Sequence, residues 1–235
     1  MKTFSRYILI LLVIASSGLF AQQKDPFTLL NNVKEKFNRI RDYKVEAQII
    51  VDVNFLKVPE SKATIYFKQP DKVKMESEGF ALLPKQGLNF SPSKLLSGDY
   101  SAIYVKEDVI NNNKVSVVKI IPNSDTTEVI LSTVWIDPLN KIIRKIETTT
   151  KRAGTVAINL EYDGNRDLPL PSEVIFTFNV SDVQMPAVLT GEMNEDSDNS
   201  NKRNNKPMSG TVTIKYQNYK INSGIKDSFF EKDKK

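Results

Sequence analysis

The side chains that could do chemistry in this sequence are mainly carboxylates, because it contains neither histidine nor cysteine. The absence of histidine removes the usual general base near neutral pH and the commonest metal ligand. The absence of cysteine removes thiol chemistry, zinc–thiolate sites and disulfides. It also removes the residue that carries a lipoprotein anchor. An enzyme would have to use carboxylates, serine or lysine, and we expect this chain not to be one.

Three carboxylates of the central region could supply the acid and base of a hydrolase: Asp137, Glu147 and Glu161. They lie in turns or alternate with basic residues such as Lys145, which is the pattern of a solvated strand face. A hydrolase is therefore the least favoured of the functions considered.

A second acidic group could hold a calcium ion: Glu192, Glu195, Asp196 and Asp198. It lacks the ordered alternation and the glycine of a calcium-binding loop. Its surroundings are rich in Asn, Asp, Ser and Lys and almost free of apolar residues. We expect residues 190–209 to form a disordered polar loop, with no metal site and no cofactor in the protein.

The first 21 residues have the pattern of a secretory signal peptide. Lys2 and Arg6 precede an apolar run over residues 7–15, and small residues lead to a cleavage site after Ala21. The run is shorter than the ~20 residues that span a bilayer, although an uncleaved anchor is the alternative. Residues 22–235 are then one exported domain, expected in the periplasm.

The charge of the mature chain excludes one class of partner. Without Lys2 and Arg6, 31 basic residues stand against 28 acidic ones, a net charge of +3. This bias is too weak and too evenly spread to indicate nucleic acid. We also expect a monomer.

Residues 25–40 predict an amphipathic helix that must pack on a sheet. Asp25 and Pro26 have the residue types of an N-cap and first helical position. Apolar residues then recur at three- and four-residue spacing, from Phe27 to Ile40. Such a helix would either cap one end of the sheet or form a movable lid over an apolar cavity.

Most of the remaining chain has the period-two alternation of strands, clearest between Thr127 and Tyr162. There, Asp137-Pro138 and a glycine turn at Gly154 divide three antiparallel strands. We expect a mainly β fold of the α+β type with about ten antiparallel strands. The expected strands are 44–58, 62–68, 72–77, 101–106, 114–121, 127–136, 142–150, 156–162, 173–180 and 211–221.

An apolar segment, residues 79–100, interrupts this pattern. Phe80 and Leu82 are large and apolar, while Pro84 and Gly87 prevent a long strand. Such a segment has to be buried or has to bind something. It either completes the core or lines the entrance of a lipid-sized pocket.

The layout resembles the periplasmic outer-membrane lipoprotein carrier and sorting family, the LolA-like proteins. The resemblance depends on LLNNVKEKFNRIRDYKVEAQI, ATIYFKQPDKVKME, VWIDPLNKIIRKIE and YQNYKINSGIKDSFF, which together span nearly the whole mature chain. It implies a curved, incompletely closed β-barrel whose concave apolar face is covered by helices. Family members take up the acyl chains of lipoproteins or sense lipidated ligands.

Two features depart from that family. The mid-chain helical lid is reduced to the apolar segment from Phe80 to Leu96, which leaves the size of the ligand open. The acidic, Asn-rich insertion from Glu192 to Asn205 is outside the usual pattern and could dock a partner.

Two functions follow from the resemblance. The first is a periplasmic carrier that transfers acyl chains of lipoproteins, or related lipids, to the outer membrane, with receptor proteins in the inner and outer membranes as partners. The second is an envelope sensor or assembly-module protein of the same fold that binds a protein. The candidate lining of the apolar cavity, which core packing explains equally well, comprises Val51, Val53, Phe55, Ile65, Phe67, Met75, Phe80, Leu82, Trp135, Phe176 and Phe178.

Overall fold

The computed structural model describes residues 24–54, 56–57, 59–78, 95–96, 98–124, 126–151, 154–164, 168–180 and 208–231. The expected signal peptide therefore lies outside the described residues. The elements are α2 (Pro26–Asn38), β1 (Asp42–Val53), β2 (Leu56–Lys57), β3 (Ser61–Lys68), β4 (Lys72–Glu78), β5 (Tyr100–Ile110), β6 (Asn113–Pro122), β7 (Val129–Asp137), β8 (Ile142–Thr150), β9 (Gly154–Glu161), β10 (Glu173–Val180), β11 (Met208–Ile221) and the short 3-10 helix η2 (Asp227–Phe230).

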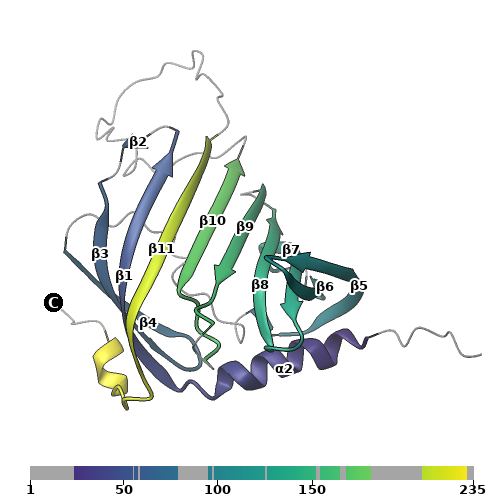
Figure 1. Ribbon diagram of the computed structural model, residues 1–235, viewed down its shortest axis with the longest axis horizontal. Helices are drawn as coiled ribbons and strands as arrows, with labels where there is room; N and C mark the ends of the chain where they lie inside the picture. Colours follow the sequence, from purple (N-terminus) through teal and green to yellow (C-terminus); the bar gives the residue numbers. More distant parts are fainter. Residues whose placement is uncertain are drawn as a thin grey trace, which may run out of the picture.

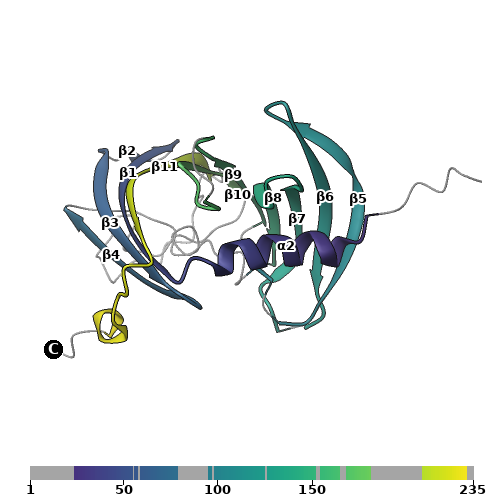
Figure 2. The same cartoon turned by 60° about the horizontal axis from the view of Figure 1, so that its bottom comes forward.

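The strands form one strongly curved antiparallel sheet, as Figures 1 and 2 show. Its order is β4-β3-β1-β11-β10-β9-β8-β7-β6-β5, and β2 pairs with β1. The first and last long strands are neighbours, with Ile49 opposite Ile214. Because β4 and β5 are the two ends of this order, the sheet is an incompletely closed barrel, and the predicted fold class is confirmed.

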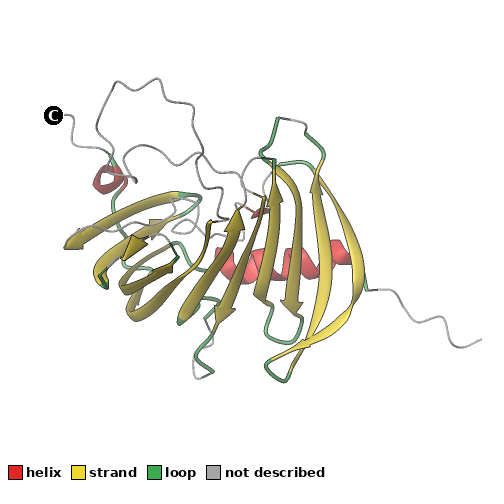
Figure 3. Ribbon diagram, turned by 90° about the horizontal axis from the view of Figure 1, so that it is seen from above, coloured by secondary structure: helices red, strands yellow, loops and turns green. Residues whose placement is uncertain are grey.

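Helix α2 crosses one side of the sheet, which we call the inner face (Figures 2 and 3). It begins as the sequence predicts, since the Asp25 carboxylate accepts hydrogen bonds from the Phe27 and Thr28 amides at 3.2 and 2.9 Å. Leu30 and Val33 are buried against the sheet. The helix lies against β5, β7 and β8 and therefore covers the inner face near one end of those strands.

The core lies between α2 and the inner face. Alternate residues of each strand enter it, such as Val134 and Ile136 of β7, and Leu96 joins them. A second cluster forms around Phe37 and Phe67, whose rings lie 5.7 Å apart. The described parts of the chain therefore share one continuous inner face on which a site can be built.

The boundary of the first strand was predicted wrongly. β1 ends at Val53 and not at Val58, because the chain turns at Asn54 and returns as β2 beside Asp52 and Val53. The alternation of apolar residues continues through this turn, so the sequence pattern alone did not show the reversal.

Two other boundaries differ from the prediction by more than two residues. β5 continues to Ile110, beyond the predicted end at Lys106, and pairs with β6 throughout. β11 begins at Met208, which pairs with Val180. Met208 and Ser209 thus belong to a strand and not to the predicted polar loop 190–209, whose other residues lie outside the described part of the chain.

Candidate functional site

A row of apolar side chains runs across eight neighbouring strands of the inner face. Its members oppose one another in register from β1 to β5. We call them the central row: Val51, Val212, Phe176, Ile158, Ile146, Val134, Val118 and Tyr104. Val51 and Ile158 are half-buried, whereas Phe176 is buried, so the row is partly core and partly accessible.

The next row lies farther from α2, toward the upper strand ends in Figure 1. We call four of its neighbouring members the distal row: Val53, Gly210, Phe178 and Val156. All four are half-buried. Phe178 packs against the main core cluster. The distal row is therefore apolar surface that the described part of the chain covers only in part.

Gly210 makes a close approach possible in the distal row. A Cβ atom on this residue would lie 2.5 Å from the Val53 Cγ1 atom and 2.8 Å from the Asp52 carbonyl oxygen. The absence of a side chain on Gly210 therefore lets Val53 of β1 pack closely against the backbone of β11.

The inner face is not apolar throughout. On the strands next to Val156, the residues in line with the distal row are Thr148 of β8 and Ser132 of β7. Their hydroxyl groups share a hydrogen bond of 3.0 Å. Ser132 is buried and Thr148 half-buried. The polar atoms satisfy each other there, so the apolar part of this row is restricted to β1 and β9 to β11.

Ile65 and Met75 extend the apolar surface toward the β4 edge. They oppose each other across β3 and β4, and Ile65 also opposes Val45 of β1. Ile65 is buried and Met75 half-buried. The structure therefore brings Val51, Val53, Ile65, Met75, Phe176 and Phe178 onto one face, as the predicted lining requires.

Phe67 and Trp135 are placed differently from the other predicted residues. Phe67 is buried in the second cluster, against the rings of Phe37 and Tyr43. Trp135 lies on the outer face, where its indole nitrogen donates to Asp108 Oδ2 at 3.2 Å and the Lys145 ammonium lies over its ring. Phe67 thus packs against Phe37 of α2 in the second cluster, and Trp135 is not part of the apolar inner face.

The described residues account for only part of the predicted lining, since Phe55, Phe80 and Leu82 lie outside them. Sequence reasoning also missed most of the central row and two members of the distal row: Val212, Ile158, Ile146, Val134, Val118, Tyr104, Gly210 and Val156. Alternation placed all of these residues except Gly210 on predicted strands, and Gly210 was expected to precede the strand 211–221. Their neighbours are set by pairing between distant strands.

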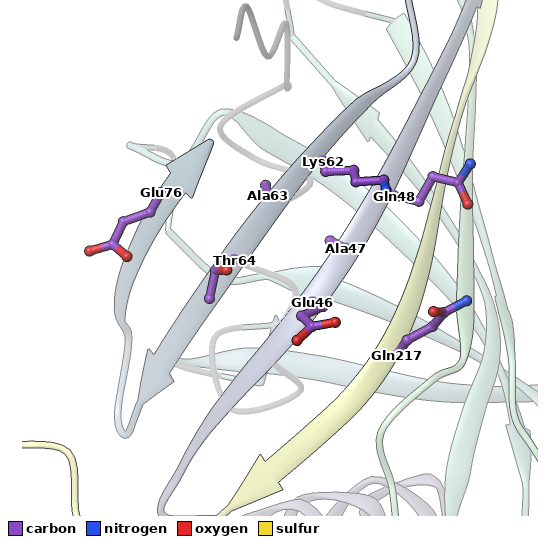
Figure 4. Close-up of a pocket in the computed structure, with 8 residues that line it drawn as sticks. All are labelled: Glu46, Ala47, Gln48, Lys62, Ala63, Thr64, Glu76 and Gln217. Carbon is purple, nitrogen blue, oxygen red and sulfur yellow. The ribbon is translucent and has the colours of Figure 1, made fainter. Parts of the chain in front are cut away.

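An open groove of about 430 Å³ lies on the outer face of β1, β3, β4 and β11 (Figure 4). Most of the residues that line it are polar, and several of their side chains are engaged with neighbours. Gln48 donates to Glu60 at 2.8 Å, Tyr66 donates to Glu76 at 3.0 Å, and Glu46 accepts from Asn218 at 2.8 Å. Ala47 and Ala63 are the only apolar residues of its lining, so the groove offers little apolar side-chain surface to a lipid.

The three carboxylates considered for a hydrolase each have a separate partner. Asp137 is buried and paired with Arg144 at 2.9 Å. Glu147 pairs with Lys145, and Glu161 accepts a hydrogen bond from Asn111. These contacts stabilise turns and strand faces.

Among the described residues, no three carboxylates lie close enough together to hold a metal ion. The acidic group between Glu192 and Asp198 falls outside this part of the chain.

The described part of the chain contains no helix with the length and apolar character needed to cross a bilayer.

Comparison with known proteins connects this geometry to a fold. Neither protein-family models nor curated proteins match the sequence. Among solved structures, a domain assigned to outer membrane lipoprotein-sorting proteins from Vibrio parahaemolyticus is similar, with a TM-score of 0.55, 11% identity, and 88% of this chain and 97% of that chain covered.

Two further structures are similar over the same extent. A LolA superfamily protein from Nitrosomonas europaea gives a TM-score of 0.53 at 12% identity, with 89% of this chain and 99% of that chain covered. A DUF1329 family protein from Desulfovibrio piger gives 0.53 at 12% identity, with 88% and 98% covered. At these identities the likeness concerns the fold, and the chain has the LolA-like fold, an incompletely closed antiparallel barrel with a helix across its inner face.

Proposed function

We propose that this protein is a periplasmic carrier that binds acyl chains of lipoproteins, or of related lipids, on its inner face and delivers them to the outer membrane. The observation that supports this most strongly is the half-buried distal row, which continues the apolar central row beyond the part of the sheet that α2 covers.

The chemistry of this face suits an acyl chain. Val53, Phe178 and Val156 present hydrocarbon, with no charged side chain among the four members of the distal row. Burying a methylene group contributes ~0.8 kcal/mol, so apolar contact alone can hold a lipid without a specific polar partner. A surface of this kind binds by the number of methylenes it covers, which suits a carrier that accepts several lipidated cargoes.

The curvature of the sheet supports the same proposal. Because the sheet is curved, β3 and β4 form one flank of the inner face, and β5 and β6 form the opposite flank (Figure 2). An acyl chain lying across β1, β11, β10 and β9 would follow the direction of the two rows. It would cross the strands and would contact Val51 or Val53 first and Ile158 or Val156 last.

The fold neighbours add a cellular context. One of them is assigned to outer membrane lipoprotein sorting, and the expected signal peptide would export the chain to the compartment between the two membranes. Carriers in this compartment must receive cargo from one membrane and release it to the other, so we propose receptor proteins on both sides as partners.

Titration of the mature protein with a fluorescent fatty acid tests the proposal. Phe178→Asp should weaken binding by at least about tenfold, because a carboxylate loses its hydration when an acyl chain covers it. The matched control is Thr177→Asp, which places the same charge on the exposed side of β10 and should leave binding unchanged. Absence of binding by the unchanged protein, or equal binding by both variants, would contradict a site on the inner face.

A further inference from the structure

The C-terminal end of the described chain lies on the outer face of β3 and β4, beside the Lys68, Lys72 and Lys74 ammonium groups. Lys68 and Lys72 both pair with the Asp227 carboxylate, at 2.9 and 3.0 Å. Lys74 lies 4.4 Å above the Phe229 ring. These contacts place one acidic and one aromatic side chain of η2 against a cluster of lysines.

The same lysines also hold the backbone of the segment. Lys68 donates to the Ile225 carbonyl at 2.7 Å, and Lys74 donates to the Phe229 carbonyl at 3.1 Å. The Phe229 ring lies 4.6 Å from the Tyr66 ring between centroids. We call Tyr66, Lys68, Lys72 and Lys74 the lysine cradle.

The segment in the cradle is held loosely. None of the residues of η2 is buried, and the Asp227 side chain is 60% exposed. Exposed ion pairs of this kind are weak and are weakened further by salt. Contacts made through long lysine side chains can break without disturbing the strands beneath them, so the segment can leave the cradle while the barrel stays folded.

The chain just before this segment is anchored firmly. The buried Asp42 carboxylate accepts hydrogen bonds from the amides of Ser223 and Gly224, at 2.8 and 3.1 Å, and from the Ser223 hydroxyl at 3.1 Å. Gly224 has a φ of +76°, a conformation that suits glycine. The firm anchor ends at Gly224, and the lysine contacts begin at Ile225. Gly224 is therefore the natural hinge of the segment 225–231, which we call the tail.

From this arrangement we propose that the lysine cradle is a docking site for a protein partner that carries an acidic residue two positions before an aromatic residue. The chain's own Asp227 and Phe229 have this spacing and occupy the cradle as an internal competitor. A partner segment that binds more tightly displaces the tail, which swings away about Gly224.

The anchor at Asp42 favours such a partner over a second copy of this chain. A tether gives the attached tail an effective concentration in the millimolar range. A second copy brings the identical tail without that advantage, so it cannot compete. A partner that makes further contacts can compete with the tail. Because the cradle contains three lysines, such a partner is expected to be acidic. This site is on the opposite face from the distal row, so the inference does not depend on lipid binding.

The test uses the whole mature chain and a fluorescein-labelled peptide whose flanking sequence is unrelated to this protein but which contains Asp-Ser-Phe-Phe. The tail is released by the double variant Asp227→Ser and Phe229→Ser, both at positions that are not buried. Fluorescence anisotropy should show at least about tenfold tighter peptide binding by the released variant than by the unchanged protein. Raising the salt concentration should weaken this binding.

Two further variants on the released background locate the site. Lys72→Glu with Lys74→Glu should abolish peptide binding. Lys62→Glu, on the same face of β3 but outside the cradle, should not change it, and melting curves should show that all variants are folded. Failure of the released variant to bind, equal binding by the unchanged protein, or binding that survives the cradle variant would overturn the proposal. A concentration-dependent dimer of the unchanged protein that is lost in the released variant would assign the cradle to a second copy and also overturn it.

Discussion

Val53 of β1 and Gly210 of β11 oppose each other so closely that a Cβ atom on the glycine would lie 2.5 Å from the Val53 Cγ1 atom. The same Cβ atom would lie 2.8 Å from the Asp52 carbonyl oxygen, so the β1 backbone also limits the space for a side chain at this position. β1 and β11 are the first and last long strands, so this contact joins residues that are far apart in the sequence and lies at the start of the distal row.

Gly210→Ala should therefore destabilise the protein. The added methyl group must displace Val53 or the β1 backbone, and overpacking of this kind costs about 1–3 kcal/mol. Urea unfolding measures the loss. Gly164→Ala is the control, since a Cβ atom there would meet nothing within 4 Å, and it should leave stability nearly unchanged. Equal stability of the two variants would show that β1 and β11 are less closely packed than described.

Leu30→Ala should loosen α2 from the inner face. Leu30 is 0% exposed and packs in the main core. Removing its side chain from a buried site costs about 2–5 kcal/mol. Asn31→Ala, at the next and exposed position of the same helix, should change the free energy of unfolding little. A loss of stability in Asn31→Ala that matched that of Leu30→Ala would contradict the assigned helix face.

The buried ion pair between Asp137 and Arg144 should make stability depend on pH. Burial acts to raise the pKa of Asp137, but hydrogen bonds from Asn140 and the charge of Arg144 outweigh it, and the pKa lies below its ordinary value. A lowered pKa means that the folded state prefers the ionised carboxylate. This contribution is present above the unfolded-state pKa of about 4 and is lost as the pH falls through the folded-state pKa.

Arg144→Met should therefore move the midpoint of acid unfolding to higher pH. It should also lower the stability at pH 7 by about 3 kcal/mol, because it leaves a buried carboxylate unpaired. Glu147→Gln removes the more exposed pair with Lys145 and should cost less than about 1 kcal/mol. Circular dichroism between pH 2 and pH 7 gives the acid midpoint, and urea unfolding at pH 7 gives the change in stability. An unchanged acid midpoint in Arg144→Met would refute the role of the pair.

The position of Trp135 gives a test of the ligand site by fluorescence. It is the only tryptophan of the chain and lies on the outer face, against Asp108 and Lys145. Its emission should not change when a fatty acid binds to the inner face. In a Trp135→Phe background, a new tryptophan introduced by Phe178→Trp should shift its emission with the same ligand. A response from Trp135 alone would place the ligand on the outer face.

Local sequence signals were sufficient for most of the elements, although not for the reversal between β1 and β2, and they did not show which strand faces lie inside. The turn at Asp137-Pro138 and the N-cap at Asp25 were predicted correctly, because each depends on a few adjacent residues. Alternation also separated Trp135 from Val134 and Ile136. It could not tell which side is inside, because both sides of β7 carry large apolar residues, and the predicted lining placed Trp135 on the inner face.

The neighbours within the site could not be derived for a related reason. Val53 and Gly210 meet because β11 pairs with β1, and Gly210 meets Phe178 because β11 also pairs with β10. These pairings join strands that are far apart in sequence, and no turn sets their register. The half-buried state of the distal row follows from the curvature of the whole sheet and from the reach of α2, which no local pattern specifies.

The central claim, that the inner face holds an acyl chain, is tested most directly by native mass spectrometry of the mature protein purified under mild conditions from the cell envelope, followed by organic extraction of the ligand. We predict one acyl-chain ligand in stoichiometric amount, retained by Thr177→Asp and lost from Phe178→Asp. An unliganded protein that also takes up neither a fluorescent fatty acid nor a lipopeptide would contradict the carrier function.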